Sequence, residues 1–548
     1  AQAILTRVNP IAKDICPEPM PNDETVAVVW FRKCLRLHDN ASLHAVVKLK
    51  PKYLLPVFVV DPRFASPSSV GVNRYRFLLE SLVDLDDQLW KQHGSQLVVL
   101  RGRPEAVLSQ LLKTGKPCGN KKPTHILWEK DIEPYAVKRD AAIEKAAVAA
   151  GVTVLKHSGH TLWDVEEALA ASNGKAPSTM PGMEALAQKM GLPAKPLPVP
   201  HRLPKPPFAA VSGKYCVPTL KEMGYKEPGT HCGYAGGERI GLARLKLQFK
   251  DTAYICQFEK PKTQSTAFSP ASTTVLSPYI KFGCVSIRKF YYELMNVLKK
   301  GKKHSKPPGS LLGQIYFREM SYLLGASIPN FDCQRGNPAC KPIPWATSKK
   351  LVTAWSEGQT GYPYIDAIMR QLSQVGWIHH LARHAVACFL TRGDLWQSWE
   401  AGRDVFDRLL LDADWALNNM NWLALSGAAP WSPPFFRVYH PVPKMDSSLN
   451  VRDPEGKYIR EFVPELSNMP SEYIYAPWTA PLEVQREAGC LIGKHYPKPV
   501  VNHEKASREN MTKFKRALAR AKQTPAAPAA AGKRKAPAGE TQPKKARK

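Results

Sequence analysis

Val26-Ala27-Val28-Val29-Trp30-Phe31 is a short apolar run that ends at the polar pair Arg32-Lys33. Further apolar runs follow at 53–60, 96–100 and 125–128, and the segments 75–90 and 135–150 between them carry apolar residues at helical spacing. Short buried strands that alternate with helices predict a parallel sheet with helices on both faces. We therefore expect a doubly wound α/β domain over residues 26–165.

The pattern changes after this domain. Prolines cluster at 193–200 and 204–207, which predicts a linker over 166–240 that lies on the surface. Beyond about residue 240, amphipathic helical stretches occupy 285–300, 311–326, 362–392 and 400–426. An all-helical C-terminal domain is expected over 241–500, and residues 1–25, which show no periodicity, are expected to be a loose leader.

Composition excludes several classes of protein. With 548 residues and 44% hydrophobic content, the chain is long enough for two folded domains. It contains neither an apolar stretch that could span a bilayer nor a secretory leader, so we expect no membrane partner and an intracellular location. The 11 cysteines show no zinc-ligand spacing, and reduced thiols are expected.

The net charge of +30 is the strongest compositional signal. From Val501 onward there are 14 Lys and Arg against 3 Asp and Glu, so much of the excess lies on the rest of the chain. A folded body this basic favours a polyanionic partner such as DNA, although a generally basic surface would give the same count. We expect a DNA-binding monomer.

The segment 501–548 is expected to be a basic and largely disordered tail. Lys533-Arg534, a nine-residue spacer and Lys544-Lys545-Ala546-Arg547-Lys548 have the spacing of a bipartite nuclear localisation signal. A generic basic tail that helps to hold DNA is the alternative. The spacing favours the nuclear localisation signal, and therefore a nuclear location.

Gly376-Trp377-Ile378-His379-His380-Leu381-Ala382-Arg383-His384 places His380 and His384 four residues apart, on one face of a helical segment. Zinc proteases use this spacing, but they need a glutamate beside the first histidine, and an adjacent Arg383 disfavours a cation. We expect no metal there. Downstream, Asp412-Ala413-Asp414 offers two acids, and a buried acid needs a partner, for which Arg383 is the obvious candidate.

These motifs, with the hydroxyl-rich stretch Ser272-Thr273-Thr274-Val275-Leu276-Ser277, resemble the flavin site of the cryptochrome/photolyase family over residues 26–500. The HHLARH run is similar to the (6-4) photolyase and animal-type cryptochrome branch. The resemblance implies that the helical domain binds FAD. It assigns cofactor contacts to Thr273, Thr274, Leu276, Ser277, Gln314, His380, Arg383, Asp412, Ala413, Asp414 and Asn418.

Several roles follow from the resemblance. Thr273, Thr274 and Ser277 match a phosphate-contacting loop, Arg383 and Asp412 match an ion pair over the flavin ring, and Asn418 matches the residue that faces N5. Four tryptophans match an electron relay that runs outward through Trp422, Trp399, Trp345 and Trp396. A protonated His380 would be the general acid toward the lesion, with His384 positioning the proton network.

Two positions depart from the family pattern. Phe317 and Ala424 stand where the family has tryptophans that line the lesion pocket together with Gln314. Their loss removes stacking surface, at about 1–3 kcal/mol per stacked base. Trp431 in the loop 426–436 is the candidate replacement.

The resemblance therefore implies a blue-light-driven (6-4) DNA photolyase that acts on UV-damaged DNA. The alternative is an animal-like cryptochrome photoreceptor whose partners are transcription factors or other signalling proteins. The four-tryptophan relay and the altered pocket favour this alternative. Trp30-Phe31-Arg32-Lys33 also matches the family's antenna domain, which implies room for a second chromophore, a deazaflavin or a folate.

Overall fold

The computed structural model describes residues 25–116, 119–209, 211, 213–226, 232–301 and 303–523. Five strands form one parallel sheet in the order β3-β2-β1-β4-β5, with registers such as Val26 beside Tyr53 and Ala27 beside His125. The strands are β1 (Val26–Phe31), β2 (Tyr53–Val60), β3 (Val98–Arg101), β4 (His125–Glu129) and β5 (Thr153–His157). The predicted parallel α/β domain is confirmed, with a fifth strand that no apolar run had indicated.

Side-chain alternation along β1 explains why helices cover both faces of the sheet. Ala27, Val29 and Phe31 share an apolar core with α1 (Ala41–Leu49) and α2 (Val72–His93). Val28 and Trp30 point into a second core, with α3 (Pro104–Thr114) and α4 (Pro134–Ala149). Successive residues of a strand face opposite sides, so one buried strand serves two cores.

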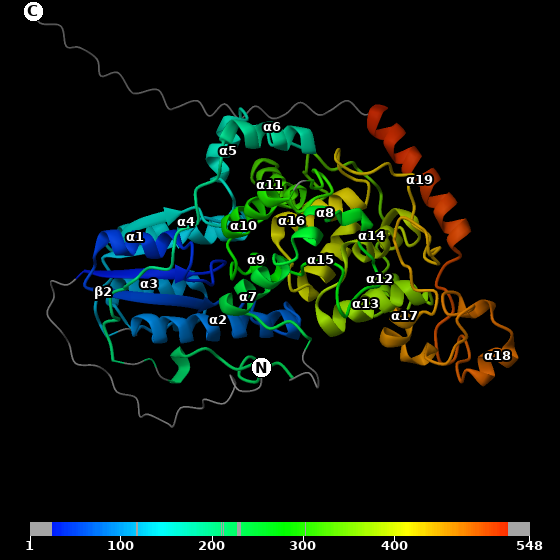
Figure 1. Cartoon of the computed structure of the whole chain (residues 1–548), viewed down its shortest axis with the longest axis horizontal. Helices are drawn as coiled ribbons and strands as arrows, with labels where there is room; N and C mark the ends of the chain where they lie inside the picture. Colours follow the sequence, from blue (N-terminus) through cyan, green and yellow to red (C-terminus); the bar gives the residue numbers. More distant parts are fainter. Residues whose placement is uncertain are drawn as a thin grey trace, which may run out of the picture.

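The remainder of the described chain is helical and lies to one side of the sheet domain (Figure 1). The strand ends nearest to it are the carboxyl ends, whose following residues reach the helices. The helices are α5 (Val165–Ala171), α6 (Met180–Met190), α7 (Glu238–Gln248), α8 (Thr252–Gln257), α9 (Ser277–Lys281), α10 (Ile287–Lys300), α11 (Leu311–Ser327), α12 (Lys349–Ser356), α13 (Pro363–Val375), α14 (His380–Cys388), α15 (Trp399–Leu409), α16 (Trp415–Leu425), α17 (Lys457–Phe462), α18 (Leu482–Glu487) and α19 (His503–Gln523). None of the described helices is long and apolar enough to cross a membrane.

Two predicted helical stretches are each divided in two. The stretch 362–392 breaks at Gly376, which ends α13 in the left-handed conformation at φ 76°, and His379 then caps α14 by accepting from the Leu381 N–H. The stretch 400–426 breaks after α15, and Asp414 caps α16. Glycine at a helix end and an acid at a helix start are the usual terminators.

The proposed linker and tail contain more structure than we expected. Helices α5 and α6 lie within 166–240, and Met183 of α6 is buried in the main helical core. Within 501–548, α19 runs to Gln523 and buries Phe514 and Asn510, so the predicted disorder is wrong for this part. The proposed nuclear signal at 533–548 and the leader at 1–24 lie outside the described residues.

Sheet and helices share one apolar core. The residues around α1 and α2 pack against Leu245 of α7, Tyr279 of α9 and Leu294 of α10 in the same cluster. Charged contacts reinforce the contact, since Arg288 of α10 lies 2.8 Å from the Asp39 carboxylate. The helical part of the described chain is therefore packed directly against the sheet domain.

Candidate flavin and DNA site

Arg383 and Asp412 form the ion pair that the sequence predicted. Arg383 Nη2 lies 2.9 Å from Asp412 Oδ2, and Ser277 Oγ donates to the same oxygen at 2.6 Å. Arg383 Nε also donates to the Ile378 carbonyl, which fixes the guanidinium on α14. The other carboxylate oxygen, Asp412 Oδ1, is buried and has no hydrogen-bond partner among the described residues. A buried carboxylate oxygen without a donor favours a ligand that brings one.

The Ser/Thr stretch before α9 is a loop and not a helix cap. The residue at the N-cap of α9 is Leu276, with no side-chain capping bond, and Thr274 accepts from Arg244 through its carbonyl. The Ser277 hydroxyl is exposed, as a ligand contact requires. Val275 has φ 48°, which strains a β-branched residue by about 1–3 kcal/mol.

The histidines gather at the start of α14. The ring centroids of His379 and His380 are 4.3 Å apart, and those of His380 and His384 are 6.1 Å apart. His379 is fixed, because its Nε2 lies 2.8 Å from Thr263 Oγ1. His384 Nδ1 lies 3.4 Å from Tyr439 Oη, and His380 is half-buried. The predicted pair is therefore a group of three.

This group, which we call the histidine chamber (Lys260, His379, His380, Arg383 and His384), concentrates positive charge. Burial and the Arg383 charge lower the pKa of Lys260 to about 8, against the influence of Asp412. Burial and the charge of Lys260 lower the pKa of His379 and of His384 to about 3. The same two causes hold the pKa of His380 well below its usual value. The imidazoles are therefore neutral at neutral pH, and an anion in the chamber would raise each pKa.

The side chains of Asp414 and Asn418 make hydrogen bonds within the protein. The Asp414 carboxylate accepts from the Ala416 and Leu417 N–H groups and from Tyr322 Oη at 2.6 Å. Burial opposes its ionisation, but nearby His160 and the charges of Lys33 and Arg318 hold the pKa of Asp414 well below its usual range. Asn418 Nδ2 donates to the Arg403 carbonyl at 3.0 Å. Their cofactor roles, and that of buried Ala413, stay predictions.

The two departures from the family pattern lie opposite each other. Helices α11 and α16 run antiparallel, since Ser321 Oγ donates to the Met420 sulfur and Gly325 lies against Trp415. One turn further along, the same register places Phe317 opposite Ala424. Gln314, another turn away, donates to the Pro308 carbonyl at 2.9 Å. The Trp431 indole donates to the Met420 carbonyl and lies beside Phe331, and its role as a replacement stays a prediction.

The tryptophans proposed as a relay fall into two locations. Trp422 lies in the core between Phe406 and Trp355, at centroid distances of 5.0 and 6.1 Å. Trp399 is also buried and is the first residue of α15. Trp422 packs against the same helix at Gly402. Trp345 and Trp396 form a close pair, with centroids 4.8 Å apart. The order of electron transfer stays a prediction.

A cavity of about 260 Å³ lies at the carboxyl end of the sheet. Arg32 and Lys33 line it directly after β1, and Glu129 and Lys130 line it at the end of β4. The strand order reverses between β1 and β4, and this switch point is where open α/β sheets bind ligands. Its wall toward the helices includes His160 and Tyr322.

Sequence reasoning missed Lys260 and the structural role of His379. Lys260 begins a short 3-10 helix (Lys260–Lys262) after α8, where nothing in the spacing distinguishes it from the other lysines of a basic chain. His379 was visible in the HHLARH run, but its contact with Thr263 joins residues 116 positions apart. Only the fold brings these groups together.

Comparison with known proteins is consistent with this geometry. Residues 27–201 match the DNA photolyase family model, and residues 311–516 match the FAD binding domain of DNA photolyase. The (6-4)DNA photolyase of Oryza sativa subsp. japonica is 44% identical over 501 residues, which cover 88% of each chain. The chain belongs to the photolyase/cryptochrome family. Cryptochrome-1 of Rattus norvegicus is also 44% identical, over 89% of this chain and 82% of that protein.

The solved structures agree on the fold of this family member. A cryptochrome from Synechocystis superposes with a TM-score of 0.77 at 25% identity, over 90% of this chain and 100% of that chain. The helical domain is thus an FAD-binding domain, and its residues fit the cofactor. Ser277 and Arg383 hold Asp412, whose Oδ1 lacks a donor that a flavin N–H could supply.

Proposed function

We propose that the protein is a blue-light-driven (6-4) DNA photolyase that binds FAD and UV-damaged DNA. The observation that carries the proposal is the histidine chamber, where His380 and His384 stand beside Lys260 and the Arg383–Asp412 pair. FAD, when bound and reduced, supplies an electron to the lesion on absorbing blue light. The chain supplies binding, charge and a proton.

His380 is the residue proposed to deliver the proton. In the free chamber its partial burial and the charge of Lys260 hold its pKa well below the usual value, so it carries no proton at neutral pH. Phosphates of a bound lesion would bring the opposite charge and raise that pKa, so the acid forms only when its substrate is present. Lys260 is placed to pair with the same phosphates, and a base taken out of the DNA stack would lie against the histidines.

The lesion pocket is lined with less aromatic surface than the family pattern predicts. The register of α11 and α16 places Phe317 near Ala424, and the Trp431 indole donates to the Met420 carbonyl. Each lost stacking contact costs about 1–3 kcal/mol of binding. We expect weaker binding of the lesion than two tryptophans would give, with the chemistry of His380 unchanged.

Repair of an oligonucleotide that carries one (6-4) lesion tests the proposal. Purified, photoreduced protein should restore the thymines under blue light and leave the lesion intact in the dark. Failure of repair by protein that holds FAD and reduces it in light would contradict the enzyme function.

That failure would favour the second candidate, a cryptochrome photoreceptor. Trp345 and Trp396 form a close pair, and Phe514 of α19 packs against both at 6.2 and 6.3 Å. If these indoles end the relay, they are oxidised beneath α19. Light would then change a surface that transcription factors or other signalling proteins could bind. Light-dependent hydrogen exchange in α19 would support this function.

Two further roles belong to the proposal. The cavity at the β1–β4 switch point is proposed to hold a second chromophore, a deazaflavin or a folate; absorbance of the protein as isolated from its source would identify it. Residues 533–548 are proposed to direct the protein to the nucleus. Their deletion should then move a fluorescent fusion into the cytoplasm.

A further inference from the structure

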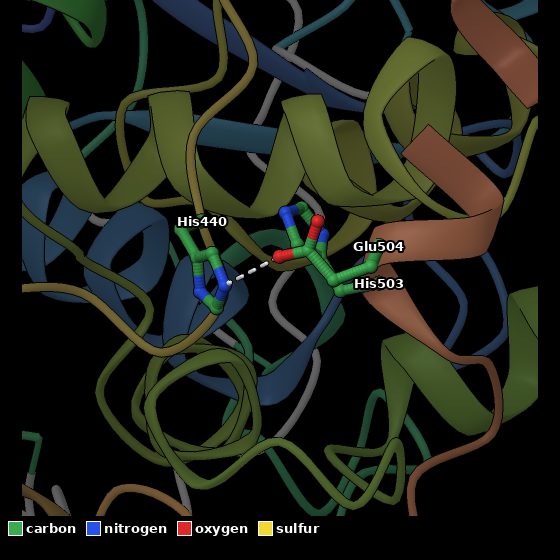
Figure 2. A group of neighbouring side chains, drawn as sticks. All are labelled: His440, His503 and Glu504. Atoms are coloured by element: carbon green, nitrogen blue, oxygen red, sulfur yellow. Dashed lines mark ion pairs between the residues drawn. The ribbon is translucent and has the colours of Figure 1, made fainter. Parts of the chain in front are cut away.

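A cluster of side chains that could bind a metal lies at the start of α19 and does not include the residues of the histidine chamber. His440, His503 and Glu504 each offer one ligand atom, and these atoms lie within 4.8 Å of one another. Figure 2 shows the His440 ring and the Glu504 carboxylate pointing toward each other, with His503 beside them. His440 Nε2 and Glu504 Oε1 are 3.6 Å apart, and the two imidazole centroids are 4.3 Å apart.

A buried carboxylate orients one of these ligands. His503 Nδ1 lies 2.6 Å from Asp394 Oδ1, so the proton is on Nδ1 and the lone pair of Nε2 is free. Asp394 is 3% exposed, and its other oxygen has no hydrogen-bond partner among the described residues. Metal-binding histidines usually donate their second N–H to such a carboxylate, which fixes the tautomer and strengthens the ligand.

We propose that His440, His503 and Glu504 bind a divalent transition ion of the Zn²⁺ class, which fastens the start of α19 to the body of the protein. Two imidazoles and one carboxylate match zinc sites with an open fourth position, whereas Mg²⁺ and Ca²⁺ prefer oxygen ligands.

Binding requires one local change. His440 Nδ1 accepts a hydrogen bond from the Val442 N–H at 3.0 Å, so Nε2 carries the proton in this structure. Coordination through Nε2 moves the proton to Nδ1 and releases the Val442 N–H to water. The loop is exposed there, so water can replace the lost partner.

The proposed ion would join segments that are far apart in sequence. His440 lies in the loop before α17, and His503 and Glu504 form the first turn of α19. Asp394 immediately precedes the turn that carries Trp396, and Asn510 donates to the Gly393 and Asp394 carbonyls. A metal at this point would thus hold α19 in place over Trp345 and Trp396, which we call the outer tryptophan pair. The proposal is independent of FAD and of repair.

Titration of the untagged, full-length, chelator-treated protein with ZnCl₂ tests the site. We expect one tightly bound Zn²⁺ per chain by calorimetry, absorption bands of tetrahedral Co²⁺ when Co²⁺ replaces it, and slower hydrogen exchange in 503–523. His440→Ala changes an exposed loop residue, so it should fold and lose this binding; Glu504→Gln should weaken it. His304→Ala, at another exposed histidine, is the matched control.

Asp394→Asn should weaken Zn²⁺ binding by about 10- to 100-fold, as expected for a carboxylate that supports a ligand. Equal stoichiometry and affinity in the wild type and in His440→Ala would overturn the proposal, as would Zn²⁺ binding that leaves the exchange of α19 unchanged. Retained FAD and an unchanged circular dichroism spectrum confirm that each variant is folded.

Discussion

The histidine chamber and the outer tryptophan pair are organised by different forces. The chamber gathers Lys260, Arg383 and three histidines, and its only described ion pair is the one with Asp412. The outer pair is covered by aromatic packing, since Phe514 of α19 stacks on Phe435 with centroids 4.9 Å apart and planes 4° apart. Charge dominates one region and apolar contact the other.

This difference predicts where each region is sensitive. Positive charge without a counter-ion destabilises the free protein, and a bound anion compensates it. We therefore expect the histidine chamber to bind an anionic ligand. The aromatic packing under α19, by contrast, requires no ligand. Substitutions in the chamber should therefore change function before stability, and substitutions under α19 should change stability before function.

Substitution of the proposed acid should have the largest effect. His380→Ala should lower the rate of (6-4) repair by about 10²- to 10⁴-fold, which is the usual contribution of general acid catalysis. The absorbance of bound FAD measures retention of the site, and His304→Ala serves as control. Repair within a few-fold of wild type would remove His380 from the chemistry.

Removal of the aromatic cover should reverse this pattern. Phe514 is 1% exposed, and Phe514→Ala should cost about 3–5 kcal/mol of local stability. Hydrogen exchange across 503–523 should accelerate while repair is retained. Lys515→Ala, at an exposed position of the same helix, should leave exchange unchanged. Loss of repair with normal exchange would contradict the comparison.

Asp412→Asn tests the ion pair of the chamber. The substitution keeps the shape but removes the charge that Arg383 and Ser277 recognise. Hydrogen bonds to charged groups contribute about 1.5–3 kcal/mol, so FAD binding should weaken by roughly 10- to 100-fold. Fluorescence titration of FAD into the apoprotein measures it, with exposed Asp404→Asn as control. Equal affinity would exclude the pair from cofactor binding.

The smallest expected effect is a pH dependence of stability. The pKa of His379 is about 3 in the folded chain, below the ordinary 6.5, so between these values the unfolded chain binds more protons. Stability should therefore fall as pH decreases below 6.5, by up to about 2 kcal/mol from this residue at pH 5. His379→Gln should lessen the drop in apoprotein Tm between pH 7 and pH 5. An identical drop would assign the proton uptake to other groups.

The sequence predicted those parts of the fold that leave a local pattern. The buried strands β1, β2 and β4 are apolar runs, whereas β5 lies at the sheet edge, has no fully buried residue and exposes Thr153 and Lys156, so it left no such run. The break at Gly376 was missed because apolar spacing continues through it. A pattern that reports burial does not report where a helix ends.

The candidate site was predictable where chemistry forces a pairing. Asp412 needed a cation, and Arg383 supplied one within the same motifs. Asp414 shows the limit, since an acid before α16 satisfies the requirements of a helix cap as well as those of a cofactor contact. Lys260, and the approach of His440 to His503, depend on long-range folding and have no signature in the spacing.

The apolar cluster that sheet and helices share has a consequence for how the chain can be divided. Tyr279 packs against Phe77 of the sheet domain, and Leu245 and Leu294 belong to the same apolar cluster, so separating the halves would expose part of this core to water. Cutting the chain in the proline-rich segment would separate the two domains expected from the sequence, but it would divide the apolar core that they share. The two halves should melt in one cooperative transition, and neither should be a soluble fragment when expressed alone.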